Sequence, residues 1–259
     1  MRQPLTVNDE PFLTIRSLSV DYKAGCVEES HSHSWAQIVY ATRGAIRIEA
    51  QNKLWMLPQG RAIFIPAQHR HRLTMPSRTQ LRTLYCNTDQ FRTSELRALS
   101  VSLLLHAAIV RVCDLGWLDG RISQDQTLTD IILDELSIAE SEIIPLKKPD
   151  DKRAKGLMCI MMDIKNRNKP LDELFKSAAL SRRTGERLFE KETGLTPGRW
   201  RRIFLLSCAL EALAEGKPIE EASNRAGFKS RAAFNDAIKQ LTGEGPGAVK
   251  KRFLRQREF

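Results

Sequence analysis

Two short segments of this chain contain the residues best suited to binding a metal ion. The first segment contains His31, His33 and Gln37, and the second contains His71. Residues i and i+2 of a strand share a face, so His31 and His33 can point into one cavity. Gln37 and His71 would then complete a set of three nitrogen ligands and one oxygen ligand.

This donor set suits a borderline divalent ion such as Zn, Ni or Fe(II), with positions left for water or for a ligand. The alternative is a group of histidines that packs in the core or lines a ligand cavity without a metal ion. The remaining histidines, His69 and His106, are expected to be surface or packing residues.

A repeat near the C-terminus contains residues suited to binding DNA. Three dipeptides recur in it: Ser-Arg, Thr-Gly and Pro-Gly begin at 181, 193 and 197 in the first copy and 49 residues later in the second. Each copy predicts a short helix, a turn, and a second helix that begins at Ser and ends at Gly. That is the outline of a helix-turn-helix, whose second helix enters the major groove of DNA.

Few side chains of each second helix are expected to reach DNA. They are Arg182, Arg183, Glu186 and Arg187 in the first copy, and Ser230, Arg231, Ala232 and Asn235 in the second. Arginine can donate two hydrogen bonds to guanine, and glutamate can accept one from cytosine. The alternative is an ordinary solvated helix face.

The positive charge is concentrated in the segment that contains the repeat. The net charge is +10, and residues after 150 contain 24 Lys/Arg against 14 Asp/Glu, whereas residues 1–150 contain 17 of each. Such a segment is what a protein that binds phosphate requires. Five scattered cysteines, with no signal segment and no long apolar run, predict a cytoplasmic protein without membrane association.

The elements that must position these residues differ between the two halves. Short alternating or apolar runs predict strands at 12–20, 37–42, 46–49, 62–65 and 81–85, typical of an antiparallel barrel or sandwich. Helical spacing follows from Thr93 to Leu115 and from Gln126 to Ala139, which would cover a barrel face or pair with another subunit. A polar, proline-bracketed stretch at 145–152 predicts a linker. Helices are then expected at 152–166, 171–177, 182–193, 198–214, 219–226, 230–241 and 247–255.

Residues 171–252 resemble the DNA-binding domain of AraC/XylS-family regulators, through Phe189–Trp200, Ala226–Phe228 and Gly245-Pro246. The resemblance implies two helix-turn-helix units joined by a long helix at 198–214. Three residues depart from the pattern: Gly185 in place of a core-facing Leu, Ile238 in place of Phe, and Asp236, which would repel phosphate if it faced DNA.

The histidine segments resemble the paired motifs of cupin barrels, which implies His31, His33, Gln37 and His71 as ligands. Here Gln37 replaces the usual Glu, which removes a negative charge, while Gln68 replaces Gly and Met75 replaces Asn. Many sensory cupin domains in AraC-type regulators keep the barrel as a ligand cavity without a metal ion.

The sequence therefore predicts an α+β chain: a cupin-like, jelly-roll β-barrel at 1–92, a helical connector and linker at 93–149, and an all-α double helix-turn-helix at 150–259. The expected function is transcription regulation, in which a small effector, a divalent metal ion or both control binding to double-stranded DNA. RNA polymerase and a second copy of the chain, through Leu96–Leu115, are further expected partners. The alternatives are a metal-dependent oxygenase or isomerase fused to a DNA-binding domain, and a nucleic-acid binder without sequence preference.

Overall fold

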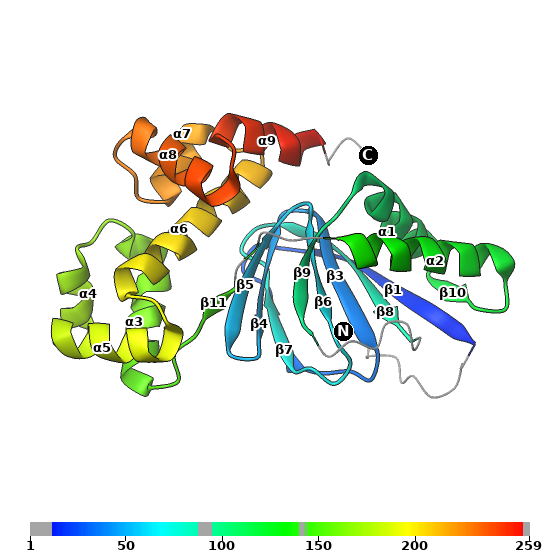
Figure 1. The fold of residues 1–259 in the computed structure, drawn as a ribbon, viewed down its shortest axis with the longest axis horizontal. Coiled ribbons are helices and arrows are strands. Elements are labelled where there is room, and N and C mark those ends of the chain that lie inside the picture. The colour runs from blue at the N-terminus through cyan, green and yellow to red at the C-terminus, as the bar shows by residue number, and fades with distance from the viewer. Residues whose placement is uncertain (1–11, 88–94, 140–142, 144, 256–259) are drawn as a thin grey trace. The chain divides into compact units, whose positions relative to one another are not determined.

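The computed structural model describes residues 12–87, 95–139, 143 and 145–255 (Figure 1). The chain divides into two compact units. Asn52–Met56 and Ile144–Arg255 form one unit, and the rest of the chain up to Ile143 forms the other. The expected boundary at residues 92 and 93 lies outside the described residues.

The first unit is built on antiparallel strands in two sheets, a jelly-roll-like sandwich rather than one closed barrel. The larger sheet has the order β10-β1-β8-β3-β6-β9, with bounds Trp117–Asp119, Leu13–Tyr22, Thr79–Cys86, Ala36–Arg43, Arg61–Ile65 and Arg97–Ser100. The other sheet contributes β4 (Ala45–Ala50), β7 (His71–Thr74) and β2 (Val27–His31) to this unit, with β7 between the other two. All five predicted strands are present.

Two helices, α1 (Leu103–Leu115) and α2 (Ser123–Ile138), belong to the same unit as the strands (Figure 1). Val112 of α1 and Ile132 of α2 are fully buried in one cluster with Ile38 and Leu84 of the larger sheet. The helices therefore cover a face of this sheet, one of the two arrangements expected.

The helix expected from Thr93 is wrong in its first part. Residues Arg97–Ser100 form β9, which pairs with β6, and α1 begins only after Ser102, whose hydroxyl accepts a hydrogen bond from the Leu105 N–H. The reason is that a short apolar run fits both periodicities, and the edge of β6 supplies backbone partners for a strand.

The second unit is helical, and the predicted helices are confirmed to within one residue with one exception. They are α4 (Leu171–Ser177), α5 (Arg182–Thr193), α6 (Pro197–Ala214), α7 (Ile219–Arg225), α8 (Arg231–Thr242) and α9 (Pro246–Arg255). The exception is the first, which divides into α3 (Lys152–Met162) and the 3₁₀ turn η3 (Ile164–Asn166). Among the described residues, no helix combines the length and apolar character needed to cross a membrane.

The predicted signals that begin and end the recognition helices α5 and α8 are confirmed. The Ser181 hydroxyl accepts from the Thr184 N–H, and the Ser230 hydroxyl accepts from the Ala233 N–H. Gly194 and Gly243 both have a φ of +75°, the left-handed conformation that closes a helix. Each unit of the repeat is therefore a helix-turn-helix, α4–α5 and α7–α8.

The predicted linker is wrong as a free polar stretch, because it contains strand β11 (Leu146–Lys147). Leu146 pairs with Leu54 of β5 (Lys53–Pro58), and both side chains are buried in the core of the second unit. The indole Nε1 of Trp200 on α6 donates to the Lys147 carbonyl at 2.9 Å. The buried Leu146 and the backbone hydrogen bonds of Lys147 and Lys148 therefore hold this segment on the helical unit.

The turn between α3 and α4 touches both helix-turn-helix units. Arg201, buried on α6, donates to the carbonyls of Asn166 and Lys169 at 2.6 and 2.8 Å. Arg167 in the same turn donates to the carbonyl of Asn224 at the end of α7 at 3.0 Å. The turn thus connects the long helix α6 with the first helix of each unit.

Candidate effector site and DNA-binding face

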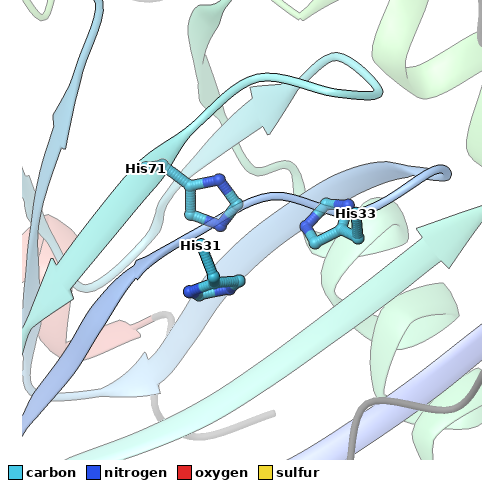
Figure 2. Close-up of side chains that lie close together, drawn as sticks. All are labelled: His31, His33 and His71. Atoms are coloured by element: carbon cyan, nitrogen blue, oxygen red, sulfur yellow. The ribbon is translucent and has the colours of Figure 1, made fainter.

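Three histidines from different parts of the β domain surround a common point (Figure 2). His31 at the end of β2 pairs across the sheet with His71 at the start of β7, and His33 lies between β2 and β3. Their ring centroids are 4.5 to 6.0 Å apart, and one ligand atom from each lies within 4.8 Å of the others. The structure therefore brings together the histidines that the sequence singled out.

Each imidazole is oriented by a backbone carbonyl. The Nδ1 atoms of His31, His33 and His71 lie 2.8, 2.6 and 2.8 Å from the carbonyl oxygens of residues 29, 35 and 69. A carbonyl can only accept, so each Nδ1 donates, and a neutral ring then has its lone pair on Nε2. This is how proteins fix the tautomer of a histidine that binds a metal ion.

The ring of His71 is the most deeply placed of the three. It is fully buried, and its Nε2 has no hydrogen-bond partner among the described residues. The pKa of His71 is lowered to about 4, mainly by burial; the bond to the His69 carbonyl opposes this shift, and the neighbouring histidines add to it. The His71 ring is therefore neutral, and the lone pair on its buried Nε2 accepts no hydrogen bond from the described residues.

Gln37 presents its amide oxygen to the same site. Its Nε2 donates to the Thr83 hydroxyl at 2.9 Å, and that hydroxyl donates to the Ile38 carbonyl at 2.9 Å. This chain of donors fixes Oε1 toward His33, whose Nε2 lies 2.9 Å away. Two atoms with lone pairs at this distance need a proton or a cation between them, and about 3 Å is the separation of adjacent ligands on one metal ion with bonds of about 2.1 Å.

Gln68 supports the site through its backbone, a role that the sequence did not reveal. Its φ is +64°, and its N–H donates to the His33 carbonyl at 2.8 Å. The only signal was the replacement of a glycine of the cupin pattern at a position that needs a left-handed backbone. The bond connects the two histidine segments.

The other two histidines are not part of this cluster. His69 is half-buried, and its Nδ1 lies 3.1 Å from the Ala67 carbonyl oxygen. His106 on α1 is buried, and its Nδ1 lies 2.8 Å from the Tyr40 hydroxyl. His106 therefore packs in the core.

The four residues expected at the DNA-binding face of α5 divide into two kinds. Arg182 is ion-paired with Glu186 at 2.9 Å and with Asp172 of α4 at 3.3 Å. Arg183 and Arg187 are exposed, and neither has a hydrogen bond or ion pair within the described part of the chain. The two unpaired guanidinium groups are available to a ligand.

The face of α8 differs in chemistry. Arg231, Ala232 and Asn235 are exposed, whereas the Ser230 hydroxyl caps the helix. Asp236 is exposed on the same helix and brings a negative charge close to these residues. The second unit therefore presents one exposed arginine beside a carboxylate, where the first presents two arginines without a partner among the described residues.

The two halves match families in the order that the fold shows. Residues 23–112 match the AraC-like ligand binding domain, and residues 174–252 match a helix-turn-helix domain. The HTH-type transcriptional regulator NimR of Escherichia coli (strain K12) is 25% identical over 218 residues, which cover 84% of this chain and 80% of NimR.

The chain is also similar to two solved structures. An unsaturated fatty acid-bound ToxT from Vibrio cholerae is 13% identical, with a TM-score of 0.40 and coverage of 96% of this chain and 97% of ToxT. KdgF from Halomonas sp. is 22% identical, with a TM-score of 0.28 and coverage of 29% and 71%. With an AraC-like ligand binding domain followed by a helix-turn-helix domain, the chain belongs to the AraC family of transcription regulators: its cupin-like domain binds a ligand and its double helix-turn-helix binds DNA.

Proposed function

We propose that the ligand-binding domain responds to a divalent metal ion held by His31, His33, His71 and Gln37, with a small effector completing the coordination. The observation that carries this proposal is the buried Nε2 of His71, which has no partner among the described residues although it faces two further imidazoles. A buried acceptor without a partner costs about 1–3 kcal/mol, and a metal ion would remove this cost.

The four proposed ligands restrict both the metal ion and the effector. Imidazole nitrogens favour Zn, Ni or Fe(II) over Mg or Ca, which prefer carboxylate oxygens. All four ligands are neutral, so the full charge of a divalent ion would remain uncompensated. An effector with a carboxylate or another anionic oxygen is therefore the class that fits the open position.

Metal content measured after dialysis tests this proposal. The wild-type chain should retain about one equivalent of Zn, Ni or Fe, and His31→Ala and His71→Ala should lose it. His69→Ala is the matched control, because the His69 ring is bonded to the Ala67 carbonyl instead of joining the cluster, so its loss should leave the metal content unchanged. Equal metal content in all four proteins would contradict the proposal.

We further propose that this domain senses its ligand and does not transform it. The support is that the chain belongs to a family of transcription regulators. Turnover assays with dioxygen and with isomerisable substrates on the metal-loaded protein decide the matter. Turnover that disappears in His71→Ala would favour the enzyme alternative.

For the DNA-binding domain, we propose that Arg183 and Arg187 read bases while Arg182 holds Glu186 in place. The support is the ion pairing of Arg182 and the absence of such pairing for the other two. A duplex selected from a random pool should bind at least about a thousandfold more tightly than a scrambled duplex. Equal binding would favour the alternative of a binder without sequence preference.

We also propose a homodimer formed through α1, together with a contact to RNA polymerase. Leu103 and Leu104 on α1 are 51% and 54% exposed, which is unusual for leucines on a helix that also packs on a sheet. Sedimentation equilibrium of wild type and Leu104→Glu tests the dimer, which the glutamate should weaken. Transcription with purified polymerase tests the second contact.

A further inference from the structure

A surface hollow of about 620 Å³, lined by three cations, lies where the second helix-turn-helix unit meets α9. Its walls come from the start of α7, the turn before α8, the first residue of α8 and the middle of α9. The cations are Lys229, Arg231 and Lys250, and Glu220 is the one acidic residue among those that line it.

These three side chains are not used within the protein. None of them has a hydrogen bond, ion pair or ring contact in the described part of the chain. Glu220 is exposed at the rim and pairs with none of them. Three cations against one carboxylate, at the wall of a hollow, attract an anion with several oxygens.

The first unit shows that this arrangement does not simply follow from the repeat. Arg182 corresponds to Arg231, and Arg201 corresponds to Lys250, since both pairs are 49 residues apart. Arg182 is paired with Asp172 and Glu186, and Arg201 is buried against the carbonyls of Asn166 and Lys169. The side chains at these two positions are therefore bonded within the protein in the first copy of the repeat, whereas in the second copy they have no partner among the described residues.

The position of the hollow within the helix-turn-helix indicates which anion it would meet. In a helix-turn-helix the first helix crosses the DNA backbone, while the start of the second helix meets the groove. The hollow joins these two places, because it includes Ile219 at the start of α7 and Arg231 at the start of α8.

We propose that this hollow binds a phosphate of the DNA backbone through Lys229, Arg231 and Lys250, so that the second unit anchors the protein without reading sequence. The inference rests on the proposed placement of the helix-turn-helix units on duplex DNA. Phosphate contacts fix the register of a protein on the duplex, and base contacts specify the sequence. Asp236 on the same face agrees with this division, because it weakens α8 as a reader of bases.

The experiment measures binding of the full chain to a selected and a scrambled duplex between 50 and 200 mM salt. Removing one phosphate contact reduces the slope of log K against log salt by about 0.9. When the salt rises from 50 to 200 mM, the fold-loss of affinity of Lys250→Ala should therefore be smaller than that of wild type by a factor of about 3.5. Its preference for the selected duplex should stay unchanged, and Lys250→Arg should restore the slope.

Lys251→Ala is the matched control, since Lys251 is an exposed cation on the same helix that does not line the hollow. The proposal is overturned if Lys250→Ala and Lys251→Ala have the same slope, or if Lys250→Ala changes the sequence preference. Inorganic phosphate that binds wild type saturably without DNA, but not Lys250→Ala, would assign the hollow to a free anion instead. If wild type binds no duplex at all, the proposed placement on DNA fails as well, which is a distinct result.

Discussion

The ring of Phe175 on α4 occupies the space that a side chain at Gly185 on α5 would need. A Cβ at Gly185 would lie 2.5 and 2.6 Å from two ring carbons of Phe175. The first helices α4 and α7 begin 48 residues apart, and the second helices α5 and α8 begin 49 apart. In the second helix-turn-helix the sizes are reversed: Ser223 takes the place of Phe175, and Phe234 takes the place of Gly185. The glycine that departs from the family pattern is thus one half of an exchange between a large and a small residue.

Gly185→Ala should destabilise the chain by about 1–2 kcal/mol, because overpacking outweighs the helix propensity that alanine adds. In a Phe175→Leu background the same change should be neutral or stabilising, since the smaller side chain can yield. Urea denaturation of the four proteins of this double-mutant cycle measures the coupling. Additive effects would show that the two residues do not compete for one space.

The turns of the two units differ at one backbone position. Ala179 has a φ of +53°, and its counterpart Gly227 has a φ of +72°. Ala179→Gly should stabilise the chain by about 0.5–1 kcal/mol, because an alanine pays a steric cost in this conformation. Gly227→Ala should destabilise it, since the new Cβ would lie 3.0 Å from the Arg167 carbonyl oxygen. Thermal unfolding measures both, and shifts of equal sign would contradict the argument.

Arg183→Ala should weaken binding to the selected duplex by about 1–3 kcal/mol and relax the preference at one base pair. Arg182→Ala should have a smaller effect, because this side chain is engaged with Glu186 and Asp172. Competition binding against single-base variants of the duplex distinguishes them. A uniform loss across all sequences would identify Arg183 as a phosphate contact.

Gln37→Glu should raise the affinity for Zn by about tenfold or more, because a carboxylate in place of the amide would offset part of the charge of the proposed metal ion. Gln37→Leu should lower the affinity. Gln240→Glu, which adds the same charge to α8 of the helical part of the chain, is the control. Competition with a chromophoric chelator measures all three, and an unchanged affinity in Gln37→Glu would exclude Oε1 as a ligand.

The sequence predicted the helical unit closely because its boundaries are marked locally. A serine cap such as Ser181 and a left-handed glycine such as Gly194 fix both ends of a helix within a dozen residues. The β domain has fewer such markers, and the sequence did not predict β2, β5, β7, β9 or β10.

The histidine cluster also could be predicted only in part from the sequence. The sequence paired the two segments because both carry donors, and the structure places these donors around one point. It did not predict the Thr83 hydroxyl that orients Gln37 or the Gln68 N–H that holds His33, because these contacts depend on register between strands. Pairing across strands is set by the whole sheet, and no local pattern encodes it.

The turn held by Arg201 and Arg167 fixes the spacing and orientation of the two helix-turn-helix units. An extra base pair between the two contacted grooves would rotate one of them by about 35° around the DNA axis, since about 10 base pairs complete a turn. A pair of units joined only by one helix could bend to follow this rotation. Here the bonds from the shared turn to α6 and α7 resist it, so binding sites for this protein should tolerate base changes between the grooves but not insertions.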